Sequence, residues 1–185
     1  MGSKLKDDDF LDMRKFVDDI SINMDDYIKI NFLTPYQLKI KSDAIFEELP
    51  LFKNTSSPRS YDWSKRVDEE LEIFEILKQK YRYSVGYLVF DDLKKKLGND
   101  RVWETNFYFS RDSRPLKLEI RLSLMYPRQI PLVSRSTGDY HVTLTDKCFG
   151  LLERRWRSDG KYGLPHFCTM IGYYYALEKM SRIID

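Results

Sequence analysis

The chain has 185 residues, which is long enough for one domain with a sizeable core plus an extension, and too short for two ordinary domains. Hydrophobic residues make up 42% of it, enough apolar area to fold without the support of disulfides or metals. Its 31 basic and 29 acidic residues nearly cancel, so no net charge favours nucleic acid or an anionic membrane, and we expect protein partners.

The cysteine count and the absence of metal- and cofactor-binding motifs narrow the class of protein further. Cys148 and Cys168, with only two histidines, form neither a zinc-finger pattern nor a disulfide framework. The sequence has no glycine-rich phosphate loop and no carboxylate cluster of ligand spacing, so we predict no metal and no cofactor. It also has no apolar signal segment and no run of about 18 apolar residues. We therefore expect a cytoplasmic protein that neither spans nor binds a membrane.

The first part of the chain reads as a helical extension. Residues 7–32 carry apolar side chains at alternating spacings of three and four on an otherwise acidic amphipathic helix, namely Phe10, Met13, Val17, Ile20, Met24 and Tyr27. This stripe either packs on the chain's own core or docks a partner, and the sequence leaves both open. Pro35 ends the helix, and a mixed segment then leads into a turn-rich stretch. We place an N-terminal extension at residues 1–48 and the main domain at residues 49–185.

The main domain begins with a helix and continues with strands. Trp63, Val67, Leu71, Phe74, Leu77 and Tyr81 recur at helical spacing, which predicts a helix over residues 61–81. Runs rich in β-branched and aromatic residues then predict strands, at residues 84–90, 102–109, 116–126 and 130–134. Residues 91–100 and 110–115 supply turn residues between the first three runs. The alternation of apolar and polar residues from Leu116 to Leu124 is typical of a strand with one buried face.

The last third combines an irregular segment with a final helix. Residues 141–156 place Cys148 behind a short polar turn, and we interpret this segment as irregular. Leu164, Phe167, Ile171, Tyr174 and Leu177 then lie on one helical stripe, with Pro165 in the first turn. The order of elements predicts an α+β fold, in which a four-stranded antiparallel meander has helices packed on one side.

Both this order and several motifs resemble the ubiquitin-conjugating enzymes. In that family a Tyr-Pro turn after the third strand leads to a cysteine that is followed by leucine at four positions and tryptophan at eight. Tyr126-Pro127, Cys148, Leu152 and Trp156 occupy those places here. The family's His-Pro-Asn triplet is not kept, because the chain reads His141-Val142-Thr143.

The chain is most similar to the conjugating enzymes of the ubiquitin-fold modifier, the ufmylation branch, which also lack that asparagine. The similarity spans about residues 48–185. It rests on two stretches, one with Pro58, Arg59, Trp63, Arg66 and Glu70, and the other with Trp156, Lys161-Tyr162-Gly163-Leu164 and His166. The residues directly before Cys148 differ from the family's pattern.

The resemblance implies a conjugating enzyme that carries a ubiquitin-like modifier as a thioester on Cys148 and transfers it to an acceptor amine. Its partners would be an activating enzyme, the modifier, and a ligase or acceptor protein. Lys147, Arg154 and Arg155 place positive charge near Cys148 in sequence, which would favour the thiolate. His141, Thr143, Asp146 and Lys147 are candidate supporting residues, and backbone N–H groups around Cys148 are the first candidates to stabilise an oxyanion.

Two other interpretations stay open. The altered residues before Cys148 also fit a catalytically inactive relative that binds modifiers or partners, in which Cys148 is a small core residue. A cysteine hydrolase that pairs Cys148 with His141 or His166 is a third hypothesis, although the flanking residues show no protease signature. Cys168, inside the final helix, is expected in the core.

Overall fold

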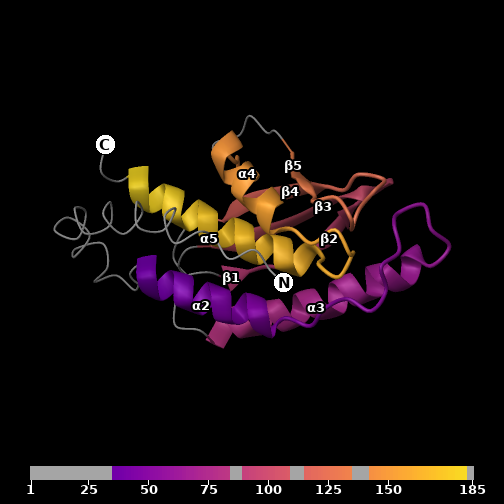
Figure 1. The fold of residues 1–185 in the computed structure, drawn as a ribbon, viewed down its shortest axis with the longest axis horizontal. Coiled ribbons are helices and arrows are strands. Elements are labelled where there is room, and N and C mark those ends of the chain that lie inside the picture. Colours follow the sequence, from indigo (N-terminus) through magenta and orange to yellow (C-terminus); the bar gives the residue numbers. More distant parts are fainter. Residues whose placement is uncertain (1–34, 84–88, 109–114, 135–141, 183–185) are drawn as a thin grey trace.

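The computed structural model describes residues 35–83, 89–108, 115–134 and 142–182 (Figure 1). In chain order the elements are α2 (Pro35–Glu48), α3 (Trp63–Tyr83), β1 (Val89–Phe90), β2 (Lys94–Lys96), β3 (Asn99–Tyr108), β4 (Leu116–Arg121), β5 (Leu132–Val133), α4 (Asp146–Arg155) and α5 (Leu164–Arg182). The predicted helix over 7–32 lies outside the described residues, as does His141. The coarse prediction of an α+β fold with an antiparallel sheet is confirmed.

Within the described residues the sheet has five strands, rather than the four that we predicted. Its order is β1-β3-β4-β5. Strand β2 pairs with the same edge of β3 as β1 does, but nearer the start of β3. The extra strand β2 lies within residues 91–100, which we predicted as a turn, because three consecutive lysines carry no strand signal. The third predicted strand is also shorter than expected, since β4 ends at Arg121 and turns follow it.

One face of the sheet is buried and the other is polar. Successive strand residues point to opposite faces, so the β3 and β4 register places apolar residues opposite one another. On the buried face, Trp103 pairs with Ile120 and Phe107 pairs with Leu116. The opposite face carries charged and amide side chains, namely Glu104, Asn106, Lys117 and Glu119. This arrangement leaves one side of the sheet for the helices.

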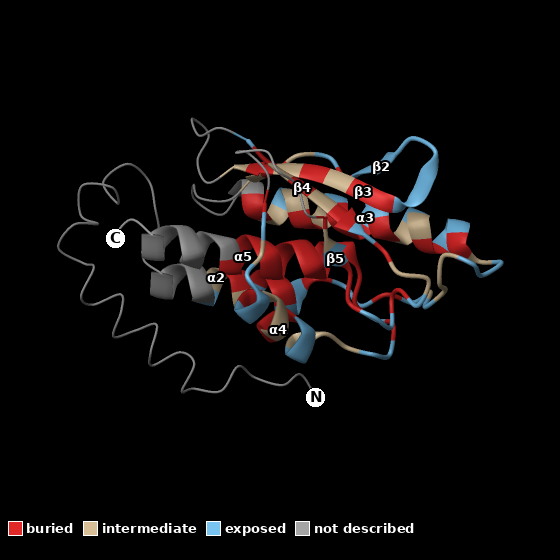
Figure 2. Cartoon of the chain, turned by 90° about the horizontal axis from the view of Figure 1, so that it is seen from above, coloured by how far each residue is buried: buried red, intermediate tan, exposed pale blue. Residues whose placement is uncertain are grey.

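Helix α5 lies at the centre of the helical layer and packs against α2, α3 and α4 (Figures 1 and 2). Every residue from Tyr162 to Tyr174 is buried, so the described part of α5 is covered on all sides rather than along one stripe. The predicted helix over 61–81 is confirmed as α3, which supplies Phe74 and Leu77 to the core. Leu177 belongs to the predicted stripe, but its side chain lies outside the description.

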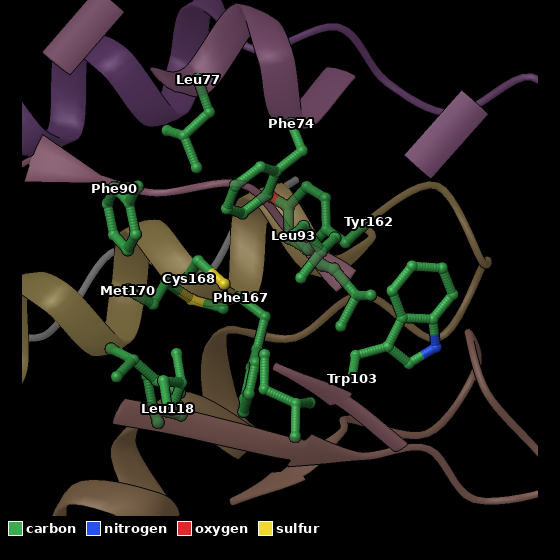
Figure 3. Close-up of a cluster of buried hydrophobic side chains, with 14 of the residues drawn as sticks. Phe74, Leu77, Phe90, Leu93, Trp103, Leu118, Tyr162, Phe167, Cys168 and Met170 are labelled. Carbon is green, nitrogen blue, oxygen red and sulfur yellow. The ribbon is translucent and has the colours of Figure 1, made fainter. Parts of the chain in front are cut away.

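The core joins residues from all these elements. In Figure 3, Phe74 and Leu77 of α3 lie at the top and Leu118 of β4 lies at the bottom, with Phe167 and Cys168 of α5 between them. Helix α2 adds its own buried side chains to the same cluster, namely Ile45 and Phe46, followed by Leu49. The domain boundary between residues 48 and 49 stays a prediction.

The segment around Cys148 is helical, which corrects our interpretation of it as irregular. Helix α4 begins directly after Thr145 and runs to Arg155. Its apolar positions repeat at helical spacing, and a capped first turn lets a short helix form despite Gly150. None of the helices in the described part of the chain combines the length and apolar character that a membrane span requires.

Candidate functional site

The candidate site is the N-terminal turn of α4, where Thr145 caps the helix. The Thr145 backbone is extended, and its Oγ1 accepts a hydrogen bond of 3.2 Å from the Cys148 N–H. Asp146 lies in the first turn, while Arg154 and Arg155 lie in the last, so both ends complement the helix dipole. Cys148 is therefore the third residue of the helix, held by a cap on its own backbone.

Burial along α4 shows which way the Cys148 side chain points. Cys148, Leu151 and Leu152 are buried, whereas Asp146 and Lys147 are exposed. Positions three and four apart share one face of a helix, so Cys148 belongs to the face that packs on the core. It retains 8% exposure, the same as Leu151, whereas Leu152 is fully buried.

Two of the three cations near Cys148 in sequence, Arg154 and Arg155, have other partners in the structure. Arg155 forms an ion pair of 3.3 Å with Asp43 of α2, and its guanidinium lies 4.3 Å from the Phe46 ring centroid. Arg154 donates through Nε to the Gly150 carbonyl at 3.3 Å. The contacts of Arg155 fasten the end of α4 to α2, and the hydrogen bond of Arg154 stays within α4. The N-terminus of α4 also lies close to Cys148, which is the third residue of the helix.

The predicted supporting residues are placed unevenly. Thr143, Asp146 and Lys147 are all exposed, on the solvent side of the chain that enters α4. They could meet an incoming protein at this end of the helix, whereas Cys148 faces inward. His141 lies outside the described residues, so its role stays a prediction.

A buried polar network brings together the two stretches that carry the family resemblance. Arg66 and Glu70 of α3 form an ion pair of 2.9 Å with neither side chain exposed. Arg66 also donates to the carbonyls of Gly160 at 2.8 Å and Tyr162 at 2.7 Å. The other Glu70 oxygen accepts the Leu164 N–H at 2.8 Å, at the start of α5. Residues more than 90 positions apart thus fix where α5 begins.

Tyr126 extends this network to the turn after β4. Its hydroxyl donates to Glu70, and burial raises the pKa of Tyr126 well above its usual value, with the Glu70 charge adding to the effect. Burial likewise raises the pKa of the Glu70 carboxyl, against the lowering effect of Arg66. The next residue, Pro127, is tied to the C-cap of α4, because Trp156 Nε1 donates to the Pro127 carbonyl at 2.9 Å. The peptide bond between Tyr126 and Pro127 is cis.

His166 is a packing residue rather than a base. Its Nδ1 accepts the Gly163 N–H at 3.2 Å, and its ring stacks on Tyr162 with centroids 4.8 Å apart. Burial, with smaller effects of the Arg66 and Arg157 charges, lowers the pKa of His166 to about 3. An imidazole held neutral and inaccessible in this way cannot take a proton from a substrate at neutral pH.

Cys168 is in the core, and its thiol is not suited to attack. The residue is fully buried within the core cluster (Figure 3). Burial raises the pKa of the Cys168 thiol, and the charge of Glu70 acts in the same direction. Of the two cysteines, Cys148 is the one with residual exposure and a helix N-terminus beside it.

The sequence did not single out Tyr174 as part of this site. The sequence placed it only on the stripe of the final helix, but its pKa, which burial raises, also responds to the charges of Arg155, Cys148 and Arg154 of α4 and of Asp43 of α2. The helical stripe that contains Tyr174 could have indicated its burial. Which residues of α4 act on Tyr174 depends on how α4 packs against α5, and the sequence does not show this.

Two further findings concern ligands. A cavity of about 470 Å³ lies beside β2, away from α4, and its charged lining residues are Lys78, Asp91, Asp92, Lys94, Glu104 and Lys117. These are three basic and three acidic side chains, so the cavity favours no ligand charge. Within the part of the chain that the structure describes, no three His, Cys, Asp or Glu side chains gather to hold a metal.

Comparison of the chain with models of known protein families gives no match, and comparison with curated proteins gives none either. The assignment to a conjugating-enzyme family therefore stays a prediction that rests on the residues quoted above.

Proposed function

We propose that this chain is a conjugating enzyme for a ubiquitin-like modifier, most similar to the ufmylation type, and that Cys148 carries the modifier. The observation that supports this best is the position of Cys148 in the capped N-terminal turn of α4, where the residue keeps 8% exposure. A helix N-terminus favours a thiolate over a thiol. The exposed Thr143, Asp146 and Lys147 at the same end supply a surface for an incoming protein.

The chemistry would proceed as two acyl transfers. The Cys148 thiolate attacks the thioester between the modifier's C-terminal glycine and the activating enzyme, and the activating enzyme's thiolate leaves. An acceptor amine then attacks the new thioester, passes a proton to water, and expels the Cys148 thiolate. Each tetrahedral intermediate carries an oxyanion, and the N–H groups of the first turn of a helix have no partner within the helix. The amides of Asp146 and Lys147 are the donors that the geometry offers.

A second candidate is favoured by the burial of Cys148. Its side chain shares a face with Leu152, which is fully buried, so access by the C-terminus of another protein is restricted. On this alternative the chain is an inactive relative that keeps the fold and binds a modifier or partner. The intact network around Arg66 and Glu70 is compatible with both candidates, because it fixes the fold and not the thiol.

A thioester assay separates the two candidates. Purified full-length protein is incubated with an activating enzyme, its modifier and ATP, and is then run on reducing and non-reducing gels beside Cys148→Ser and Cys168→Ser. The carrier function predicts a reducible adduct that is lost in Cys148→Ser, where an ester resistant to reductant replaces it, and kept in Cys168→Ser. Absence of any adduct, from a folded protein that still binds the modifier, would overturn the carrier function and favour the binding module.

A further inference from the structure

The tip of the hairpin formed by β2 and β3 projects from the sheet and carries an exposed leucine. Strand pairing places Lys96 opposite Asn99, so Leu97 and Gly98 form a two-residue turn between them. Gly98 has a φ of 78°, a conformation that favours glycine, and Leu97 is fully exposed at the apex. Figure 2 shows this exposed hairpin on the opposite side of the molecule from α4. The hairpin therefore presents an apolar side chain to any surface that approaches it.

The same hairpin tip, residues 94–101, concentrates positive charge. All eight residues are exposed. They carry four cationic side chains against the one carboxylate of Asp100, namely Lys94, Lys95, Lys96 and Arg101. Their net charge is +3, whereas the whole chain carries +2. The near-neutral total charge, from which we expected no binding to a membrane, is thus distributed unevenly, with an excess of positive charge at one projecting end.

The carboxylates near the hairpin tip hold its lysines only weakly. Lys95 Nζ lies 3.4 Å from Asp100 Oδ1, and Lys96 Nζ lies 3.7 Å from Glu119 Oε2. The two lysine side chains are 41% and 55% exposed. Ion pairs with this exposure contribute little free energy and are screened by salt. A surface with a high density of negative charge can therefore replace these partners at little cost.

The shape and composition of the hairpin tip favour a lipid surface as its partner. Single-stranded nucleic acid binds by stacking on aromatic side chains, and residues 94–101 contain none. A Cβ at Gly98 would meet nothing within 4 Å, so the turn is convex and forms no groove for a peptide. Lysines on an edge strand also prevent pairing with a second copy, but that role does not require a leucine at the apex. An anionic bilayer accommodates both features, because it attracts lysines and takes up apolar side chains.

We propose that the hairpin tip docks on a membrane surface rich in anionic lipids, with Leu97 inserted among the headgroups and the four cationic side chains near the lipid phosphates. Four charges and one leucine give reversible attachment rather than permanent anchoring. Because α4 lies on the opposite side of the molecule, the docked chain would keep that side open to other proteins. The proposal does not depend on the proposed function.

The test is co-sedimentation of the full chain with lipid vesicles, without activating enzyme or modifier. One set of vesicles contains about one third phosphatidylserine in phosphatidylcholine, and the other contains phosphatidylcholine alone. We expect binding to the first set only, and loss of this binding when salt is raised from about 0.1 M to about 1 M.

Two variants test the two features of the hairpin tip separately. Lys94→Gln, Lys95→Gln and Lys96→Gln combined should weaken vesicle binding about a hundredfold, since each lysine near an anionic surface contributes about fivefold. Leu97→Ser should weaken it about tenfold, because it removes the side chain that enters the bilayer. All four side chains are exposed, so we expect circular dichroism and thermal unfolding of both variants to match those of the wild type.

Exposed residues elsewhere provide matched controls. Lys53→Gln, Lys65→Gln and Lys161→Gln combined remove the same charge outside the hairpin, and Tyr61→Ser removes an exposed aromatic ring. Both controls should bind vesicles within about twofold of the wild type, because charges more than a Debye length from the membrane are screened. Equal losses in the two triple variants would show that total charge drives the binding, and would overturn the proposal.

Other results would also overturn the proposal. These are equal binding to both sets of vesicles, absence of binding to either, or unchanged binding in Leu97→Ser, which would leave no insertion of the apex. Binding of a soluble polyglutamate peptide through the same lysines, without binding to vesicles, would assign the hairpin tip to an acidic protein partner instead. A chain that binds vesicles as expected but forms no thioester on Cys148 would overturn only the proposed function.

Discussion

The network that positions α5 leaves no space for a side chain at Gly163. A Cβ built on Gly163 would lie 2.3 Å from two atoms of the Phe52 ring and 2.7 Å from Glu70 Oε2. Neither neighbour can withdraw freely, because Phe52 is buried under the Arg66 guanidinium and Glu70 is bonded to α5. We therefore expect Gly163→Ala to lower the free energy of unfolding by about 1–3 kcal/mol in urea denaturation.

Gly150 is the matched control for this substitution. It lies inside α4, and a Cβ there would meet nothing within 4 Å. Alanine is a better helix residue than glycine, so Gly150→Ala should raise the free energy of unfolding by roughly 0.5–1 kcal/mol. Equal destabilisation by both alanines would contradict the claim that the space at Gly163 is filled by Phe52 and Glu70.

At the scale of the element, α4 depends on its cap. Thr145 Oγ1 accepts the Cys148 N–H, and that bond satisfies one of the amides that a helix leaves open at its start. Thr145→Ala should cost about 1 kcal/mol of unfolding free energy and should speed hydrogen exchange at the Cys148 amide. Thr145→Ser should retain the wild-type values, since it keeps the oxygen. The neighbouring exposed Thr143→Ala serves as control, and an effect as large as that of Thr145→Ala would contradict the cap.

The elements that could be predicted from sequence are those with a strong local pattern. Helix α3 and strands β3 and β4 follow from periods of 3.6 and two. Strand β2 could not be predicted, because its lysines gain their place by pairing with β3 rather than from propensity. Helix α4 had a usable signal that we did not weigh, namely a threonine cap followed by apolar residues three and four positions apart.

At the scale of the molecule, the candidate site depends on contacts that no local pattern encodes. Arg66 bonds to Tyr162 across 96 positions, and Tyr126 reaches Glu70 across 56. The sequence indicated that these residues matter through their resemblance to a family, but it could not show that they share one buried network. The inward orientation of Cys148 is likewise not encoded by a local pattern, because it follows from how α4 packs on α5.

The last prediction concerns the stability of the whole molecule as the pH falls. Burial lowers the pKa of the His166 imidazole to about 3, while the unfolded chain binds a proton at this residue near pH ~6.5. Between these values the unfolded state holds more protons than the folded state, so stability is fully present above pH ~6.5 and is lost as the pH falls toward 3. The contribution of His166 approaches about 1.4 kcal/mol per pH unit.

His166→Asn isolates this effect, because its amide oxygen can still accept the Gly163 N–H and does not titrate. Glu70 opposes the trend in both proteins, since its raised pKa lets the folded state bind a proton first. The difference between the two proteins in urea-unfolding free energy, measured from pH 7 to pH 4.5, therefore reports His166 alone. We expect wild type to lose stability more steeply than His166→Asn, by about 1 kcal/mol per pH unit below pH 6. Parallel curves would show that His166 takes up its proton over the same pH range in the folded protein as in the unfolded chain. The closed packing of Phe46, Phe52 and Tyr162 around His166 would then have to open.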